Sequence, residues 1–151
     1  MKKLNFSPIL LLFITFLALS VTSCKTEGCT DPEGVNYDAD ADEDDGTCTY
    51  ARDPFIGAFN VNENCDSGNY NYTMSVAESG TSVSDIVLNN FGDFGVNVRA
   101  TVSGSNISFN DTQNGISFSG SGSLSGSTLT IIYTASQAGY TDSCTKTAIK
   151  Q

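Results

Sequence analysis

The sequence predicts an all-β protein built from an antiparallel up-and-down meander of about eight strands. From residue 55 onward, apolar and polar residues alternate with a period of two, which is typical of strands with one buried face. Short segments rich in Gly, Asn and Ser separate these runs, and no run shows a helical period. The expected strands are 55–64, 69–78, 82–90, 95–103, 106–110, 115–124, 127–136 and 140–149.

The second expected strand shows the pattern clearly. Tyr70, Tyr72, Met74 and Val76 alternate there with smaller, mostly polar residues. Between the strands, pairs such as Asn114-Gly115 tolerate the positive φ angles of tight hairpins. Because the connections are short, each strand is expected to pair with the next one along the chain.

Two architectures accommodate such a meander. A closed barrel pairs the first strand with the last, and a bond between Cys65 and Cys144 would tie these two strands together. An immunoglobulin-like sandwich has a similar number of strands, but it usually buries a Trp between its cysteines. Because the chain has no Trp, we favour the closed barrel.

Residues 1–23 are typical of a secretory signal peptide, which is removed from the mature protein. Lys2 and Lys3 give a positive start, and the apolar run 9–19 is shorter than the roughly 20 residues of a membrane span. An N-terminal anchor helix is the alternative.

The end of this segment, Val21-Thr22-Ser23-Cys24, resembles a bacterial lipobox, although Thr22 departs from the usual Gly, Ala or Ser. The resemblance implies a thioether-linked diacylglycerol and an acylated amino terminus on Cys24, with palmitate as a typical chain. It places the protein on the outer membrane of a Gram-negative bacterium, on the periplasmic or the cell-surface side. Ordinary cleavage that leaves a free Cys24 is the alternative.

The charge of the chain argues against nucleic-acid partners. The full sequence has a net charge of −10, and removal of Lys2 and Lys3 with the leader leaves −12. Such a surface repels phosphate backbones and anionic lipids. The excess is greatest in residues 24–50, which hold nine acidic residues and one basic residue.

The cysteines support an exported protein. If Cys24 is lipidated, four of the five cysteines remain, an even number that suits disulfides in an oxidising compartment. Pairing Cys29 with Cys48 and Cys65 with Cys144 is the simplest of the possible connectivities. A zinc site is disfavoured because there is no CxxC spacing and no histidine.

Two regions are expected in the mature chain. Residues 24–53 hold few large apolar side chains, namely Val35, Tyr37 and Tyr50, so they cannot form a core of their own. A disulfide would clip this acidic segment into a small loop module. The β domain then occupies residues 54–151.

The acidic segment is a candidate calcium site. Its aspartates alternate in a way that resembles the DxDxDG segments of thrombospondin type 3 repeats, and a curving loop with such oxygen ligands suits Ca²⁺. The run departs from an EF-hand loop at Glu43 and Thr49. A solvated, self-repelling spacer is the alternative. The candidate ligands are Asp38, Asp40, Asp42, Asp44 and Asp45, with Asp31 as a possible addition.

The whole arrangement resembles surface lipoproteins of the Bacteroidota type. The match is carried by a "GCTDPxxxNYxxxAxxDDGxCxY" module that starts at Gly28, followed by a β domain rich in Ser and Gly. Asp38 and Ala39 depart from the usual module residues. The resemblance implies a secreted, surface-associated setting and no particular activity.

The sequence favours a non-enzymatic protein. It has no histidine as a general base and no GxSxG elbow for a serine nucleophile. Carboxylate pairs can act on a β scaffold, but the spacing does not distinguish the available acids from solvated loop charges. These candidates by type are Glu63, Glu78, Asp85, Asp93, Asp111 and Asp142.

A second resemblance suggests a carrier. The "FIGAF" stretch, Phe55 to Phe59, resembles the Gly-x-Trp start of lipocalin-like proteins, with Phe59 in place of Trp and Lys146 or Lys150 in place of the family's late basic residue. It implies a barrel that holds a small apolar ligand, whereas a barrel filled by side chains is the alternative. We therefore expect a surface module that binds a protein or glycan or has a structural role, or a lipocalin-like carrier.

Overall fold

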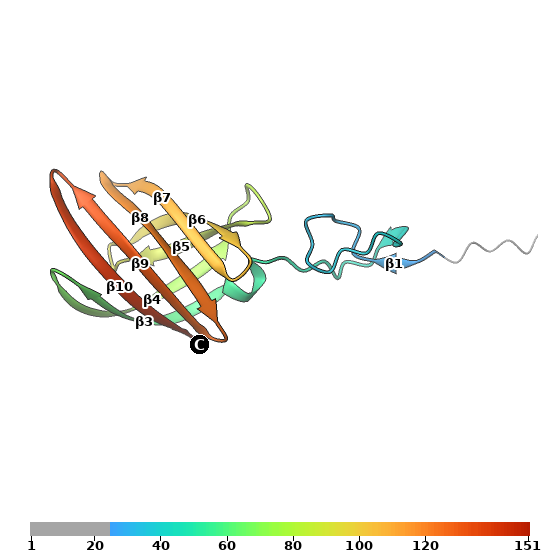
Figure 1. The fold of residues 1–151 in the computed structure, drawn as a ribbon, viewed down its shortest axis with the longest axis horizontal. Coiled ribbons are helices and arrows are strands. Elements are labelled where there is room, and N and C mark those ends of the chain that lie inside the picture. The colour runs from blue at the N-terminus through green and yellow to red at the C-terminus, as the bar shows by residue number, and fades with distance from the viewer. Residues whose placement is uncertain (1–24) are drawn as a thin grey trace, which may run out of the picture.

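The structure, a computed structural model, describes residues 25–151. The predicted signal peptide and the predicted lipidation site Cys24 lie outside the described residues. Figure 1 shows a β-barrel joined through a short connection to a small module that precedes it in the chain. Within residues 25–151, no helix is both long enough and apolar enough to cross a bilayer.

The β domain is a closed antiparallel barrel of eight strands, as predicted, and not a sandwich. Each strand pairs with the next, and the last strand pairs with the first. The strands are β3 (Gly57–Cys65), β4 (Gly68–Glu78), β5 (Asp85–Phe91), β6 (Val96–Ser103), β7 (Asn106–Gln113), β8 (Ile116–Ser125), β9 (Thr128–Gln137) and β10 (Tyr140–Lys150).

Apart from shifts of one residue, the observed elements differ from the expected ones at four places. Strand β5 begins at Asp85 and not at residue 82, because residues 79–84 form the turn that precedes it. The first strand begins at Gly57, because Asp53–Phe55 form a 3-10 turn, η1, with Pro54 in its first turn. Strand β7 extends to Gln113, because its last residues pair with the start of β8. The acidic module also contains a two-residue parallel pair, β1 (Glu27–Gly28) with β2 (Glu43–Asp44), which alternation cannot reveal.

The barrel closes where β3 meets β10. In this register Cys144 lies opposite Cys65, and Lys146 lies opposite Glu63. Cys65 and Cys144 form a disulfide with a sequence separation of 79 residues. The bond therefore joins the two strands whose pairing depends on the most distant parts of the domain.

The alternating residues of the strands form the barrel core. Apolar side chains dominate it at the end where η1 lies, and Phe55 of η1 is itself buried among them. Removing apolar surface from water stabilises the folded state by about 25 cal/mol per Å2, and this is the main stabilising contribution of such a core. Its largest members include Phe59, Met74, Ile86, Leu88, Leu129 and Ile131.

Segment 50–55 covers one end of the barrel. Arg52 donates from Nη1 to the carbonyl of Ser82 at 2.7 Å and pairs through Nη2 with Glu78 at 2.9 Å. At the chain's other end, Lys150 Nζ donates to the carbonyl of Pro54 at 2.8 Å. These contacts fix the connection to the barrel and leave the opposite end as its mouth.

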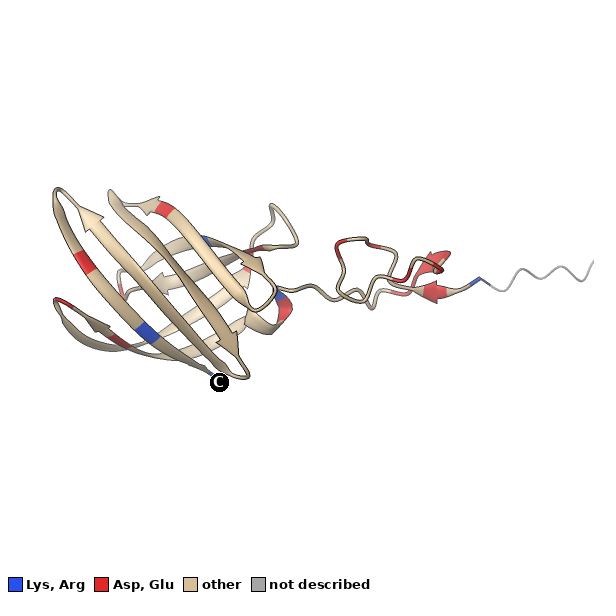
Figure 2. Ribbon diagram, in the orientation of Figure 1, with Lys and Arg blue, Asp and Glu red and all other residues tan. Residues whose placement is uncertain are grey.

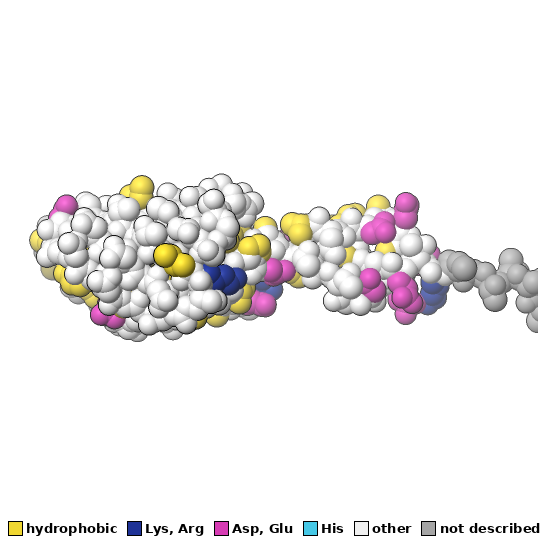
Figure 3. All heavy atoms as spheres, turned by 90° about the horizontal axis from the view of Figure 1, so that it is seen from below, with side chains coloured by type: hydrophobic (Ala, Val, Ile, Leu, Met, Phe, Trp, Pro, Cys, Tyr) yellow, Lys and Arg dark blue, Asp and Glu magenta, His cyan; other side chains and the backbone are white. Residues whose placement is uncertain are grey.

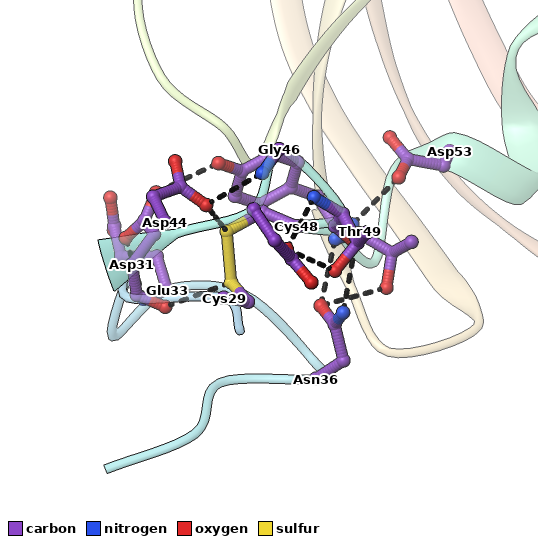
Figure 4. The surroundings of a disulfide bond; sticks show 12 residues. Cys29, Asp31, Glu33, Asn36, Asp44, Gly46, Cys48, Thr49 and Asp53 are labelled. Atoms are coloured by element: carbon purple, nitrogen blue, oxygen red, sulfur yellow. Dashed lines mark hydrogen bonds between the residues drawn. A yellow bond between two sulfur atoms is a disulfide. The ribbon is translucent and has the colours of Figure 1, made fainter. Parts of the chain in front are cut away.

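The module is held by a disulfide between Cys29 and Cys48 and by one amide side chain (Figure 4). Asn36 Oδ1 accepts hydrogen bonds from the Thr49 N–H at 2.8 Å and the Thr49 hydroxyl at 3.1 Å. Asn36 Nδ2 donates to the carbonyl of Thr47 at 2.8 Å. Asn36 therefore connects the two halves of a loop that has little apolar surface to bury.

Charge is distributed unevenly over the two parts. Acidic residues gather in the module, including β1 and β2 (Figure 2). On the face seen in Figure 3, uncharged side chains and backbone make up most of the barrel surface. The module is therefore the strongly acidic part of the mature protein, as its sequence indicates.

Candidate functional site

A cavity of about 360 Å3 opens at the mouth of the barrel. The mouth is the end at which the turns after β3, β5, β7 and β9 lie, opposite η1 (Figure 1). Its volume lies within the range of small-molecule sites, roughly 300–1,000 Å3. The lining residues are Glu63, Cys65, Ser67, Tyr70, Gly92, Asp93, Phe94, Ile116, Tyr133, Ala135, Gln137, Tyr140, Asp142 and Cys144.

An ion pair lies below this cavity. Lys146 Nζ is 3.1 Å from Glu63 Oε1, and the two side chains are 0% and 1% exposed. Both face inward because they share strand parity with core residues, Val61 on β3 and Ala148 on β10. Tyr133 donates from its hydroxyl to the same Glu63 oxygen at 2.8 Å.

Aromatic rings surround the Lys146 ammonium. Nζ lies 3.4 Å from the centroid of the Phe91 ring and 4.5 Å from that of Tyr133. It also donates a hydrogen bond to the Tyr72 hydroxyl at 2.9 Å. Burial lowers the pKa of Lys146 to about 8, although the charge of Glu63 opposes this effect. The electron-rich ring faces and the carboxylate together offset part of the lost hydration of the ammonium.

The two tyrosines of this group keep their protons. Burial, and then the negative charge of Glu63, raises the pKa of both Tyr72 and Tyr133 well above the ordinary value. The Tyr72 hydroxyl also accepts a hydrogen bond from the Gly92 N–H at 3.1 Å. The polar group below the cavity is thereby linked to the β5–β6 loop at the mouth.

Glycine on β8 allows Tyr133 to occupy its position. A Cβ atom at Gly120 would lie 2.5 Å from the Tyr133 Cβ and 2.5 Å from the carbonyl oxygen of Ile132. A side chain at Gly120 would therefore force β8 and β9 apart. The sequence shows Gly120 in a strand, but the reason for it appears only in the packed barrel.

The disulfide forms part of the cavity wall. Glu63, Cys65 and Cys144 place their potential ligand atoms within 4.8 Å of one another, and no other such trio is found within residues 25–151. A disulfide sulfur lacks the thiolate charge that metal ligation needs. With Cys65 and Cys144 bonded to each other, the trio does not make a metal centre.

The acids considered as catalytic candidates fall into two groups. Glu63, Asp93 and Asp142 line the cavity, and the structure brings them to one end of the barrel. The others have separate structural contacts: Glu78 pairs with Arg52, Asp85 accepts from the hydroxyls of Thr81 and Thr101, and Asp111 accepts from the backbone of Arg99 and Thr112.

The aspartates of the acidic run make local hydrogen bonds. Asp38 accepts from the Asp40 N–H at 2.9 Å, and Asp44 accepts from the Gly46 N–H at 3.1 Å. Asp45 accepts from the Thr47 hydroxyl and N–H, which lower its pKa. The predicted ligand set, Asp38, Asp40, Asp42, Asp44 and Asp45, does not include three carboxylates gathered at ligand-sharing distance, so calcium binding stays a prediction.

Asp31, the additional ligand of that hypothesis, has its own partner. Its Oδ1 accepts from the Glu33 N–H at 2.9 Å, and its Oδ2 accepts from the Tyr50 hydroxyl at 2.8 Å. These two bonds lower the pKa of Asp31, with the Glu33 N–H as the larger cause. Asp31 therefore connects the disulfide loop to the segment that enters the barrel.

The residues that suggested a lipocalin-like barrel lie close to its closing seam. Phe59 is fully buried and is paired across the seam with Lys150, whose ammonium binds the η1 backbone. Lys146, the other candidate, points into the core. The fold is thus compatible with a lipocalin-like barrel. No protein-family model matches the chain, and no curated protein matches it.

Proposed function

We propose that the chain is an exported, lipid-anchored and non-enzymatic binding protein whose barrel accepts a small, mainly apolar ligand at its mouth. The observation that carries the proposal is the cavity of about 360 Å3, which is lined by aromatic and aliphatic side chains with a few polar groups. This combination is typical of small-molecule sites, and barrel mouths are a frequent location for them.

The composition of the cavity floor supports binding over a purely structural role. A buried ion pair rarely stabilises a fold more than well-packed apolar residues of similar volume do. Glu63 and Lys146 nevertheless lie in the barrel where an apolar pair would complete the core. A polar floor below an apolar opening orients a ligand that carries a polar group.

The N-terminal part fits the same proposal. The lipobox-like Cys24 would attach the protein to the membrane, and the acidic module between Lys25 and Arg52 would separate the barrel from the lipid surface. The module's negative charge repels anionic headgroups, and calcium, if bound, would stiffen it. Anchoring and calcium binding rest on the sequence alone.

Ligand binding can be tested with N-phenyl-1-naphthylamine, a neutral apolar probe that fluoresces in dry sites. We expect saturable binding to residues 25–151, weakened in Ala135→Leu and lost in Ala135→Trp, because Ala135 lines the cavity. Ala77→Trp, on the exposed face of β4, is the matched control and should bind as the unmodified protein does.

The proposal is wrong if the probe does not bind, or if both tryptophan variants bind it equally well. Far-ultraviolet circular dichroism of each variant establishes that the barrel is retained. The Ala135→Leu variant adds less volume than Ala135→Trp, so a graded loss of affinity separates filling of the cavity from disruption of the fold.

A further inference from the structure

We infer that the cavity at the barrel mouth selects small organic cations, specifically a protonated amine attached to an apolar body. The inference rests on the proposed function and specifies the ligand's chemical class. Three features of the cavity lead to it, namely its charge, a carboxylate oxygen at its floor and the aromatic residues at its rim.

The cavity carries an excess of negative charge. Glu63, Asp93 and Asp142 line it, and its lining includes no lysine or arginine. The positive charge of Lys146, which does not line the cavity, neutralises that of Glu63. Neither Asp93 nor Asp142 takes part in an ion pair of residues 25–151. Two of the three carboxylates therefore remain uncompensated, which favours a cation and disfavours an anion.

The floor offers an acceptor for an ammonium N–H. Lys146 and Tyr133 both contact Oε1 of Glu63, at 3.1 Å and 2.8 Å. Glu63 also lines the cavity, so its carboxylate, which has several lone pairs, can accept a further hydrogen bond from a group that enters there. A ligand ammonium that donates to this carboxylate gains a charge-assisted hydrogen bond, which is stronger than a bond between neutral groups.

The rim is rich in aromatic side chains. Tyr70, Phe94 and Tyr140 line the cavity and are 41%, 52% and 62% exposed. Exposed rings of this size around a concave site provide contact area for an apolar ligand body. Their faces also attract cations, as the interior of this barrel demonstrates where Lys146 Nζ lies over Phe91.

An anionic ligand does not fit the same site. The ammonium of Lys146 is fully buried, and Glu63 lies between it and the cavity. A carboxylate or phosphate that entered would meet three carboxylates before any cation. The hydrogen bonds that Asp142 accepts from the Ser67 N–H and hydroxyl lessen its repulsion without removing its charge.

The test compares three ligands of similar shape by isothermal titration calorimetry: 2-phenylethylamine, 2-phenylethanol and phenylacetate. We expect the amine to bind about tenfold more tightly than the alcohol, because it adds a charge-assisted hydrogen bond. Phenylacetate should not bind measurably. Raising the ionic strength should weaken binding of the amine and leave that of the alcohol unchanged.

A variant pair locates the charge effect. Asp93 has a positive φ of 60°, a conformation that asparagine also tolerates, so Asp93→Asn removes the charge with little strain. We expect Asp93→Asn to lower affinity for the amine about threefold or more and to leave affinity for the alcohol unchanged. Asp40→Asn, in the distant module, removes the same charge and should change neither affinity.

The outcomes separate the two levels of the argument. If 2-phenylethanol binds as tightly as the amine, or if N-phenyl-1-naphthylamine binds and the amine does not, the preference for cations is wrong while the binding function stands. If neither the probe nor any of the three ligands binds, the proposed function itself fails. Equal losses in Asp93→Asn and Asp40→Asn would also overturn the cation site.

Discussion

Glu63 and Lys146 provide the most direct test of how the barrel interior is held together. Their charged atoms are 3.1 Å apart in a site with almost no solvent exposure. At an effective dielectric constant of about 20, two unit charges at this distance attract by about 5 kcal/mol. That attraction opposes the loss of hydration, which amounts to several kcal/mol for each ion.

A double-mutant cycle measures this balance. Lys146→Met leaves the Glu63 carboxylate buried without its counter-charge, and the free energy of unfolding should fall by about 3–5 kcal/mol. Glu63→Gln retains an acceptor for the Tyr133 hydroxyl but leaves the ammonium unpaired. In the double variant both charges are absent, so its stability should lie within about 1 kcal/mol of the unmodified protein.

Urea unfolding followed by near-ultraviolet circular dichroism is a suitable assay, because the chain has six tyrosines and no tryptophan. We expect an interaction energy of at least about 2 kcal/mol between the two substitutions. Glu78→Gln is the control: it breaks an exposed ion pair with Arg52 and should cost less than about 1 kcal/mol. Additive losses for Glu63→Gln and Lys146→Met would refute the reasoning.

Three further predictions concern pH, the disulfides and calcium. Because the pKa of Lys146 is about 8 in the folded protein and 10.5 in the unfolded chain, the unfolded chain binds more protons in this window, so stability should rise from pH 8 to about 10. Lys146→Met should remove that rise in urea titrations, and a stability that falls with pH would contradict it. Replacing Cys65 and Cys144 by Ala should lower barrel stability by about 4–5 kcal/mol, whereas the same change at Cys29–Cys48 should leave the barrel transition unchanged. Calorimetric titration should show Ca²⁺ binding at about millimolar concentration. Replacing the aspartates between residues 38 and 45 by asparagine should weaken this binding. A titration without heat would contradict the calcium site.

The strand pattern was predictable because it is local. A period of two with polar residues outward follows from the geometry of a single strand, and the turns follow from the residues at positive φ, such as Asn114 and Gly115. The largest errors in strand bounds lie at β5 and β7. Residues 82–84 belong to the turn before β5, and Asp111 to Gln113 continue a ladder with β8 that the pattern of their side chains does not indicate.

The ion pair below the cavity was not predicted, although a signal for it was present. Glu63 shares strand parity with Cys65, and Lys146 shares it with Cys144. Once the two cysteines are assumed to bond across the seam, parity alone turns both charged side chains inward. A charged residue in a strand usually faces solvent, so without the bond between the cysteines nothing in the sequence distinguishes Glu63 from the other acids of the domain.

The sequence by itself determined the all-β class, the number of barrel strands and the faces that they bury, since each depends on residues close together in the chain. Only the tertiary structure decided that Lys146 lies opposite Glu63, that Gly120 admits Tyr133, and that three carboxylates and three exposed aromatic rings meet at one end of the barrel. The Glu63–Lys146 pair and the shared cavity join strands distant in sequence, whereas Gly120 meets Tyr133 across a single hairpin. The ion pair depends on the register in which the first and last strands pair, and a shift of one residue there would turn Lys146 to the face opposite Glu63.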